Sequence, residues 1–261
     1  MNPYIGITDF MQFSQVEEML KVFNAHKPRG SNRKLHVGVM MSHKTLNNIP
    51  NEWQNAFPPK EVIADIFSSD EAYNCLHYAD YDRDNTSSLQ EYLLEAIGYG
   101  GEKIHALQLD MVWPDPWRIS DAVRRSGKDI EIILQVGKNA LEEIGDDPQS
   151  VVQMLEAYEG VIHRVLLDKS MGRGVGMNAL ELIPLAHAIR ERFPNLGLVV
   201  AGGLGPKSVN LARPVIEVFP DISIDAQSKL RPSGSALDPV DWEMAGVYLI
   251  KALDLFWFAK G

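Results

Sequence analysis

The fold of this chain is decided by a pattern that is clearest at Val165-Leu166-Leu167-Asp168-Lys169-Ser170-Met171-Gly172-Arg173-Gly174-Val175-Gly176. Here a short apolar run ends in a carboxylate and opens into a loop with glycines at alternating positions. Two similar units follow, Leu198-Val199-Val200-Ala201-Gly202-Gly203-Leu204 and Ile222-Ser223-Ile224-Asp225-Ala226-Gln227-Ser228. Short apolar runs are typical of parallel strands covered on both faces. We therefore expect the residues that follow these strands to meet at one end of a parallel sheet.

The same alternation of apolar runs and amphipathic stretches covers the whole chain. The predicted strands are Tyr4–Thr8, Leu35–Met41, Asn74–Ala79, Ile104–Leu109, Ile130–Val136, Ile162–Leu167, Leu198–Ala201 and Ile222–Ala226. The predicted helices are Gln15–Asn24, Lys60–Phe67, Ser88–Ile97, Ile119–Arg125, Gln149–Tyr158, Ala179–Arg192, Ser208–Phe219 and Pro239–Phe258. This pattern predicts an α/β protein in which residues 1–261 form one (β/α)8 TIM barrel domain. An open doubly wound sheet is the alternative.

Composition limits the classes of partner. The chain has 261 residues and a formal net charge of −10, which argues against a nucleic-acid partner. Its single cysteine, Cys75, excludes an intramolecular disulfide and a cysteine-rich zinc site. The N-terminus lacks the pattern of a signal peptide, and no apolar run approaches the length of a membrane span. We expect a soluble, cytoplasmic protein with no membrane partner.

The glycine-rich loops predict a phosphate site in the C-terminal half of the barrel. The expected phosphate-binding residues are Gly174, Gly176, Gly202, Gly203 and Ser228. Glycine lets the backbone approach an anion closely, so several N–H groups can point at one phosphate. Helices predicted to start near Asn178 and Pro206 would add their positive ends. The first loop taken alone is equally well explained as a flexible turn.

The motifs resemble those of phosphoribosylanthranilate isomerase, a barrel enzyme of tryptophan biosynthesis in the ribulose-phosphate-binding superfamily. The matching segments, in chain order, are Ile5-Gly6-Ile7-Thr8, Leu107-Gln108-Leu109-Asp110, Leu166-Leu167-Asp168 with Gly174-Val175-Gly176, Val200-Ala201-Gly202-Gly203-Leu204-Gly205-Pro206 and Ile224-Asp225-Ala226-Gln227-Ser228. The likeness is specific after about residue 160. It implies an enzyme that isomerises a phosphorylated sugar derivative by acid and base catalysis.

The chain departs from that family at the catalytic base. The family's first-strand motif begins with a cysteine that acts as base, and Ile5 stands at this position. Isoleucine cannot transfer a proton, so we expect activity on phosphoribosylanthranilate to be absent or very weak. The family's substrate-binding arginine after the second strand also has no clear counterpart, and Lys44 is the nearest cation. The resemblance therefore implies a relative with an altered substrate or mechanism.

The resemblance and the strand ends together nominate four carboxylates. Asp168 resembles the general acid of the family, and Asp225 resembles a carboxylate that binds its substrate. Asp9 and Asp110 follow the first and fourth predicted strands and could replace the missing base. The alternative for each is a loop or helix cap.

Two other functions are consistent with the sequence. Lys169, at the end of the sixth strand, could form a Schiff base in an aldolase or lyase, or contact the substrate. Adjacent strand residues point in opposite directions, so Asp168 and Lys169 should not both face the barrel axis. The third possibility is a barrel that binds a phosphorylated metabolite without catalysis.

No metal or other cofactor is predicted. His43, His77 and His105 could be combined with Asp80 and Asp110 into a metal site, but no pair has the spacing of a metal motif. Ordinary hydrogen-bonded histidines are the preferred interpretation.

Three further segments have expected positions. The irregular stretch Ser42–Pro58 should lie at the C-terminal face of the barrel, where loops carry function. Trp113–Trp117 could wall off a ring-containing substrate or pack on helix ends. Leu249–Phe258 should be a packing face, or the seam of a possible homodimer.

Overall fold

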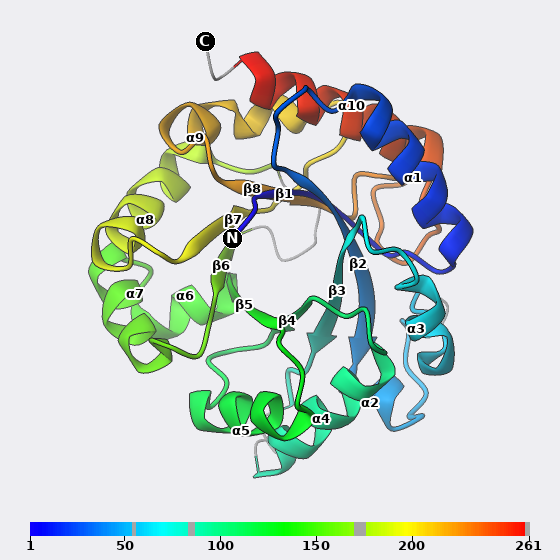
Figure 1. Cartoon of the computed structure of the whole chain (residues 1–261). Coiled ribbons are helices and arrows are strands. Elements are labelled where there is room, and N and C mark those ends of the chain that lie inside the picture. The colour runs from blue at the N-terminus through cyan, green and yellow to red at the C-terminus, as the bar shows by residue number, and fades with distance from the viewer. Residues whose placement is uncertain (54–55, 83–86, 170–175, 259–261) are drawn as a thin grey trace.

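The computed structural model describes residues 1–53, 56–82, 87–169 and 176–258. Eight parallel strands pair in chain order, and the last pairs with the first, which closes the barrel (Figure 1). The strands are β1 (Tyr4–Thr8), β2 (Lys34–Ser42), β3 (Tyr73–Ala79), β4 (Ala106–Asp110), β5 (Glu131–Gly137), β6 (Arg164–Asp168), β7 (Gly197–Val200) and β8 (Ser223–Ala226). The prediction of a (β/α)8 barrel is confirmed.

Helices form an outer ring around the strands (Figure 1). They are α1 (Phe13–His26), α2 (His43–Leu46), α3 (Ile63–Ile66), α4 (Leu89–Tyr99), α5 (Pro116–Ser126), α6 (Lys138–Ile144), α7 (Pro148–Leu155), α8 (Ala179–Arg192), α9 (Arg213–Val218) and α10 (Trp242–Phe258). The C-terminal helix α10 lies beside α1, so the two ends of the chain close the ring together.

The alternation of side chains along each strand creates two apolar regions. Alternate strand residues point into the barrel, where a small cluster fills its interior; this cluster contains Tyr4, Cys75, Ala106, Ile133, Leu166 and Val199. The residues between them point outward and join the larger core beneath the helices. The barrel is therefore a packed body, and space for a ligand lies at its end.

Three predicted helices are divided in the structure. Gln149–Tyr158 is α7, which ends at Leu155, followed by a 3-10 helix over Glu156–Tyr158. Lys60–Phe67 is a 3-10 helix over Lys60–Val62 followed by the single turn α3, and Ser208–Phe219 is a 3-10 helix over Val209–Ala212 followed by α9. Pro214 stands in the first turn of α9, where its missing N–H is tolerated, and so marks a helix start inside the predicted span. The helix expected to begin near Pro206 begins at Val209, as a 3-10 helix rather than an α-helix.

Two helices of the structure were not predicted. The helices α2 and α6 follow β2 and β5 directly, where the periodic signal is only four and seven residues long. No helix in the described ranges is long and apolar enough to cross a membrane. The C-terminal segment packs as expected, because Leu249, Leu253 and Phe256 are buried while Trp257 and Phe258 are exposed.

Candidate active site

A cavity of about 1100 Å³ opens at the C-terminal end of the barrel. Residues at or just beyond the strand ends line it: Thr8, Ser42, Ala79, Asp110, Gly137, Asp168, Ala201 and Asp225. Binding and catalytic groups of this fold are built on the loops at this end. The cavity is large enough for a substrate of metabolite size.

The long loop after β2 forms one wall of the cavity. Ile49, Trp53 and Phe57 line it, and the rings of Trp53 and Phe57 stack with their centroids 5.8 Å apart. The prediction that Ser42–Pro58 lies at the C-terminal face is confirmed. This loop supplies the apolar surface that the Trp113–Trp117 segment could have provided.

The Trp113–Trp117 segment packs elsewhere. The Trp113 indole N–H donates to the Ala140 carbonyl, and its ring lies against Tyr158. Trp117 is exposed to solvent. Neither tryptophan lines the cavity, so packing on neighbouring helices is the correct interpretation for Trp113 alone.

Three carboxylates converge on the cavity from alternate strands. Asp110, Asp168 and Asp225 end or nearly end β4, β6 and β8, and all three line the cavity. The register pairs Asp110 with Ala79 and Asp168 with Gly137, so small neighbours leave the carboxylates room to face inward. A negative charge near a carboxylate raises the pKa of that carboxylate.

Asp110 has a strongly perturbed acidity. Burial raises its pKa to about 6, the Tyr81 hydroxyl lowers it by donating a hydrogen bond, and the charge of Asp168 raises it. A carboxylate with this pKa is largely ionised at neutral pH, yet it is a stronger base than an ordinary aspartate. The sequence did not distinguish Asp110 from other strand-end aspartates, because Tyr81 lies on a different loop.

Asp225 lies deeper in the barrel. It accepts a hydrogen bond from the Thr8 hydroxyl at 3.1 Å and one from the Ala226 N–H at 2.9 Å. Burial, opposed by these two hydrogen bonds and aided by the charges of Asp9 and Asp168, raises the pKa of Asp225 to about 7. Gly6 on the neighbouring strand leaves room for this carboxylate, since a Cβ there would lie 2.3 Å from its Oδ1.

Asp9 lies outside the cavity lining. Its carboxylate forms a buried ion pair with the Arg231 guanidinium at 2.8 Å and accepts a hydrogen bond from Gln227 at 3.0 Å. Its backbone adopts a φ of 84°, in the left-handed region. These contacts hold the loops after β1 and β8 together, so the position of Asp9 does not suit it to replace the missing base.

Ile5, which stands where the family has its catalytic cysteine, does not face the cavity. Ile5 is fully buried in the outer core between the strands and the helices. Thr8 lines the cavity, and alternate residues of a strand share a face. Ile5 therefore faces away from the cavity, and even a cysteine at this position would not point at a substrate.

The two nominated lysines point to different places. Lys44, in α2, lines the cavity. Lys169 instead pairs with Asp146 at 2.7 Å and with Glu181 at 3.7 Å, and it does not line the cavity. The prediction that Asp168 and Lys169 do not both face the barrel axis is confirmed.

The structure brings part of the predicted phosphate set together. Gly202, Gly203 and Ser228 line the cavity. Gly176 does not, and a Cβ on it would lie 3.0 Å from Leu211. Gly174 lies outside the described residues. The α-helix start near Asn178 is confirmed, where the Asn178 side chain caps α8 by accepting a hydrogen bond from the Leu180 N–H.

The Gly202-Gly203 turn presents two backbone donors. Its φ angles are 128° and 58°, so both residues have a left-handed or similar backbone that glycine adopts readily. Within the described ranges, neither N–H has a hydrogen-bond acceptor. Successive free N–H groups in a turn of this kind can bind an anion.

The histidines nominated for a metal site are not brought together. His43 lies 3.8 Å from Asp80, and His105 accepts a hydrogen bond from the Asn74 N–H below the cavity. His77 does line the cavity, but its neighbours are His36 and Cys75. Sequence reasoning missed His36, because a single histidine inside a strand carries no metal-motif spacing.

Comparison with known proteins supports the fold. No protein-family model matches the chain, and no curated protein matches it. A phosphonopyruvate hydrolase structure is similar with a TM-score of 0.52 and 13% identity, over 86% of this chain and 75% of that one. A triosephosphate isomerase from Bartonella henselae has a TM-score of 0.51 and 11% identity, over 97% and 99% of the two chains. The chain has a TIM-barrel fold. At these identities the likeness extends to the fold alone. It does not test the resemblance to phosphoribosylanthranilate isomerase.

Proposed function

We propose that this protein is an enzyme that isomerises a phosphorylated sugar derivative by proton transfer, as a relative of phosphoribosylanthranilate isomerase with altered chemistry. The observation that carries the proposal is the pair Asp110 and Asp168, which line the same cavity, where the charge of Asp168 raises the pKa of Asp110. Pairs of carboxylates whose environments separate their acidities are the usual means of dividing acid and base roles.

The two carboxylates receive different roles. Asp110 is the base that replaces the missing cysteine, because its raised pKa makes it a stronger base than an ordinary carboxylate. Asp168 is the acid, as the resemblance implies. Asp225 and Lys44 bind the polar groups of the substrate from the floor and the rim of the cavity.

The phosphate is held on the side of the cavity formed by the loops after β7 and β8. The N–H groups of Gly202 and Gly203 and the side chain of Ser228 would contact it. Gly174, which the resemblance adds to this set, lies outside the described residues. Fixing the phosphate at this position aligns the rest of the substrate between Asp110 and Asp168.

The Schiff-base alternative is less well supported. A nucleophilic lysine must reach the carbonyl carbon of the substrate, and Lys169 is engaged with Asp146 and Glu181 outside the cavity lining. Borohydride trapping with a carbonyl substrate should therefore fail. A non-catalytic metabolite-binding barrel is the remaining alternative, and turnover of any substrate excludes it.

The test of catalysis is incubation in D2O with aldose phosphates, ketose phosphates and phosphoribosylanthranilate. We expect a new isomer, or deuterium at the carbon next to the carbonyl, with at least one sugar phosphate and little or none with phosphoribosylanthranilate. Asp110→Asn and Asp168→Asn should each lower the rate by about 10²–10⁴-fold. Asp221→Asn is the matched control, because Asp221 is exposed and lines a different pocket. Full activity of Asp110→Asn would contradict the assignment.

The phosphate site has its own test. Gly203 has a φ of 58°, which aspartate and asparagine both tolerate. Gly203→Asp places a negative charge beside the proposed phosphate, and Gly203→Asn adds almost the same volume without charge. Calorimetric titration with ribulose 5-phosphate and with ribulose should show preference for the phosphate, lost in Gly203→Asp and better retained in Gly203→Asn. Equal affinity of the wild type for the two sugars would refute the site.

A further inference from the structure

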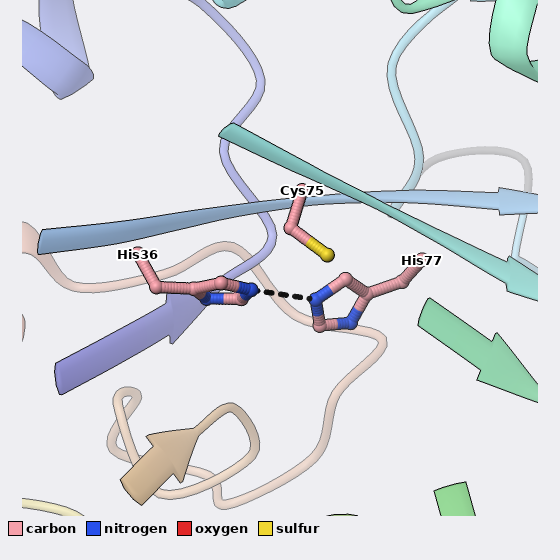
Figure 2. A group of neighbouring side chains, drawn as sticks. All are labelled: His36, Cys75 and His77. Atoms are coloured by element: carbon pink, nitrogen blue, oxygen red, sulfur yellow. Dashed lines mark hydrogen bonds between the residues drawn. The ribbon is translucent and has the colours of Figure 1, made fainter. Parts of the chain in front are cut away.

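His36, Cys75 and His77 form a cluster inside the barrel, at the floor of the cavity (Figure 2). One ligand atom of each, a ring nitrogen or the sulfur, lies within 4.8 Å of the others. All three side chains are buried, and His77 also lines the cavity. The residues come from the adjacent strands β2 and β3, which fix their relative positions.

The two imidazole rings point their Nε2 atoms toward each other. Nε2 of His36 and Nε2 of His77 are 3.3 Å apart (Figure 2). Two nitrogens that bind one tetrahedral zinc ion at about 2.0–2.1 Å lie roughly 3.3 Å from each other. The spacing therefore suits a shared metal ion as well as it suits a hydrogen bond.

A hydrogen bond alone leaves a buried nitrogen unsatisfied. If Nε2 of His36 donates, its Nδ1 is a bare acceptor; if Nε2 accepts, Nδ1 carries a proton. Nδ1 of His36 has no hydrogen-bond partner in the described part of the chain, and an unsatisfied buried polar atom costs about 1–3 kcal/mol. The nearest carboxylate oxygen is Oδ1 of Asp225, at 3.9 Å.

A metal ion on the two Nε2 atoms would fix the tautomer of His36. Each Nε2 would then offer its lone pair to the ion, and Nδ1 of His36 would carry the proton and face the Asp225 carboxylate. Histidine ligands usually direct their other ring N–H at such a carboxylate, which orients the ring. The ring of His36 is further fixed by stacking on Tyr4, with centroids 4.5 Å apart.

No side chain projects from β2 at Gly38, beside the ring of His77. Gly38 lies between the two histidine-bearing positions of β2 and β3, and a Cβ on it would lie 3.0 Å from Nε2 of His77 and 2.6 Å from the Thr8 hydroxyl. Any other residue would therefore occupy the space next to the nitrogen. The nearby carboxylates of Asp110, Asp168 and Asp225 favour a cation at this end of the barrel.

We propose that His36, Cys75 and His77 bind one divalent transition-metal ion, Zn²⁺ or an ion with the same ligand preference, at the floor of the cavity. Imidazole and thiolate ligands select this class of ion over Mg²⁺ or Ca²⁺. Three protein ligands leave the fourth position of a tetrahedral ion for water or a substrate oxygen, and His77 puts that position in reach of the cavity. The proposal does not depend on the isomerase function.

The test is titration of chelator-treated protein with Co²⁺, followed by absorption spectroscopy. We expect one Co²⁺ per chain and a thiolate-to-cobalt charge-transfer band in the near ultraviolet. Cys75 is the single cysteine of the chain, so this band can arise from no other residue. Zn²⁺ should displace Co²⁺ and abolish the band, whereas Mg²⁺ should not. Absence of the band in the wild-type protein would overturn the proposal, whatever any variant does.

Variants locate the ion. Cys75→Ser should abolish the charge-transfer band, and His36→Asn and His77→Asn should each weaken Co²⁺ binding more than tenfold, since loss of an outer partner alone costs about 10–100-fold. His43→Gln is the matched control, because His43 also lines the cavity but lies outside the cluster. Binding that depends on His43 and not on His36 would place the ion at the rim and refute the proposed ligands.

Discussion

At the scale of single residues, Asp110 shows how a neighbour sets the chemistry of a carboxylate. The Tyr81 hydroxyl donates to Oδ1 of Asp110 and stabilises its ionised form. Burial acts in the opposite direction and is the larger effect, so the pKa of Asp110 lies near 6. The pKa of Asp110 is thus set by two opposing effects. The sequence predicts the strand-end position of Asp110, but it does not predict the contact with the Tyr81 loop.

This balance gives a prediction for Tyr81→Phe. The variant loses the hydrogen bond that lowers the pKa of Asp110, so that pKa should rise above 6. Carboxyl carbon NMR titration, with Asp110→Asn to assign the signal, measures it directly. Tyr92→Phe is the control, because Tyr92 packs against His43 and not against Asp110. An unchanged or lower pKa in Tyr81→Phe would contradict the role of the hydroxyl.

The same pKa has a consequence for stability. A folded-state pKa of about 6, above the ordinary value of 3.8, means that folding favours the protonated form of Asp110. The stabilising contribution of Asp110 is therefore present below pH 4 and is lost as pH rises through 6. Asp110→Asn should gain stability relative to wild type over this range, by no more than about 3 kcal/mol. Urea unfolding at pH 4 and pH 7 measures the difference.

At the scale of elements, the sequence predicted the strands well and the helices unevenly. Buried parallel strands are short apolar runs with clear borders, so all eight were found. Helices of one or two turns, such as α2 and α3, owe their form to the loop around them, and a periodic pattern cannot appear in four residues. The wall formed by Trp53 and Phe57 was located only as a loop, because Ser42–Pro58 has no periodic pattern from which their stacking could be predicted.

The site was predictable where it depended on strand ends. Asp110, Asp168 and Asp225 could be nominated because the carboxyl ends of barrel strands share one face, and all three line the cavity. Their acidities and hydrogen bonds could not be predicted, because the partners lie on other strands or loops. His36 was missed for the same reason. Its position two residues before Gly38 places it on the same face of β2, and β2 pairs with β3, so the sequence did indicate that His36 faces the barrel interior near His77.

Close approach of β1, β2 and β3 predicts the effect of Gly38→Ala. The added Cβ would lie 2.6 Å from Oγ1 and 3.1 Å from Cα of Thr8, and the backbone atom cannot move aside cheaply. We expect destabilisation of about 1–3 kcal/mol in urea unfolding. Gly98→Ala is the control: Gly98 is inside α4 with nothing within 4 Å of an added Cβ, so the substitution should stabilise by about 0.5–1 kcal/mol. Equal effects of the two substitutions would refute the close contact.

At the scale of the whole molecule, the barrel depends on the junction between the first and last strands. β1 pairs with β8, and the loops beyond them are joined by the buried ion pair of Asp9 and Arg231. The two residues are 222 positions apart, so no local pattern could reveal their contact. The ring of Phe10 also packs on Trp242 at the start of α10, with centroids 4.8 Å apart. Closure of the barrel thus depends on the strand pairing of β1 with β8, the buried ion pair and the aromatic contact.

The ion pair predicts a characteristic pattern of unfolding energies. Asp9→Asn leaves the Arg231 guanidinium buried without its counter-charge, and Arg231→Met leaves the Asp9 carboxylate in the same condition, so each should cost about 3–5 kcal/mol. The double variant removes both charges and should therefore cost clearly less than the sum of the two. Glu159→Gln is the control, since its pair with Arg192 is exposed and should contribute about 0–1 kcal/mol. Urea unfolding of all four variants measures these energies. If the double variant equals the sum within about 0.5 kcal/mol, the two charges are not coupled, and closure of the barrel must then rest on the strand ladder and the Phe10 contact.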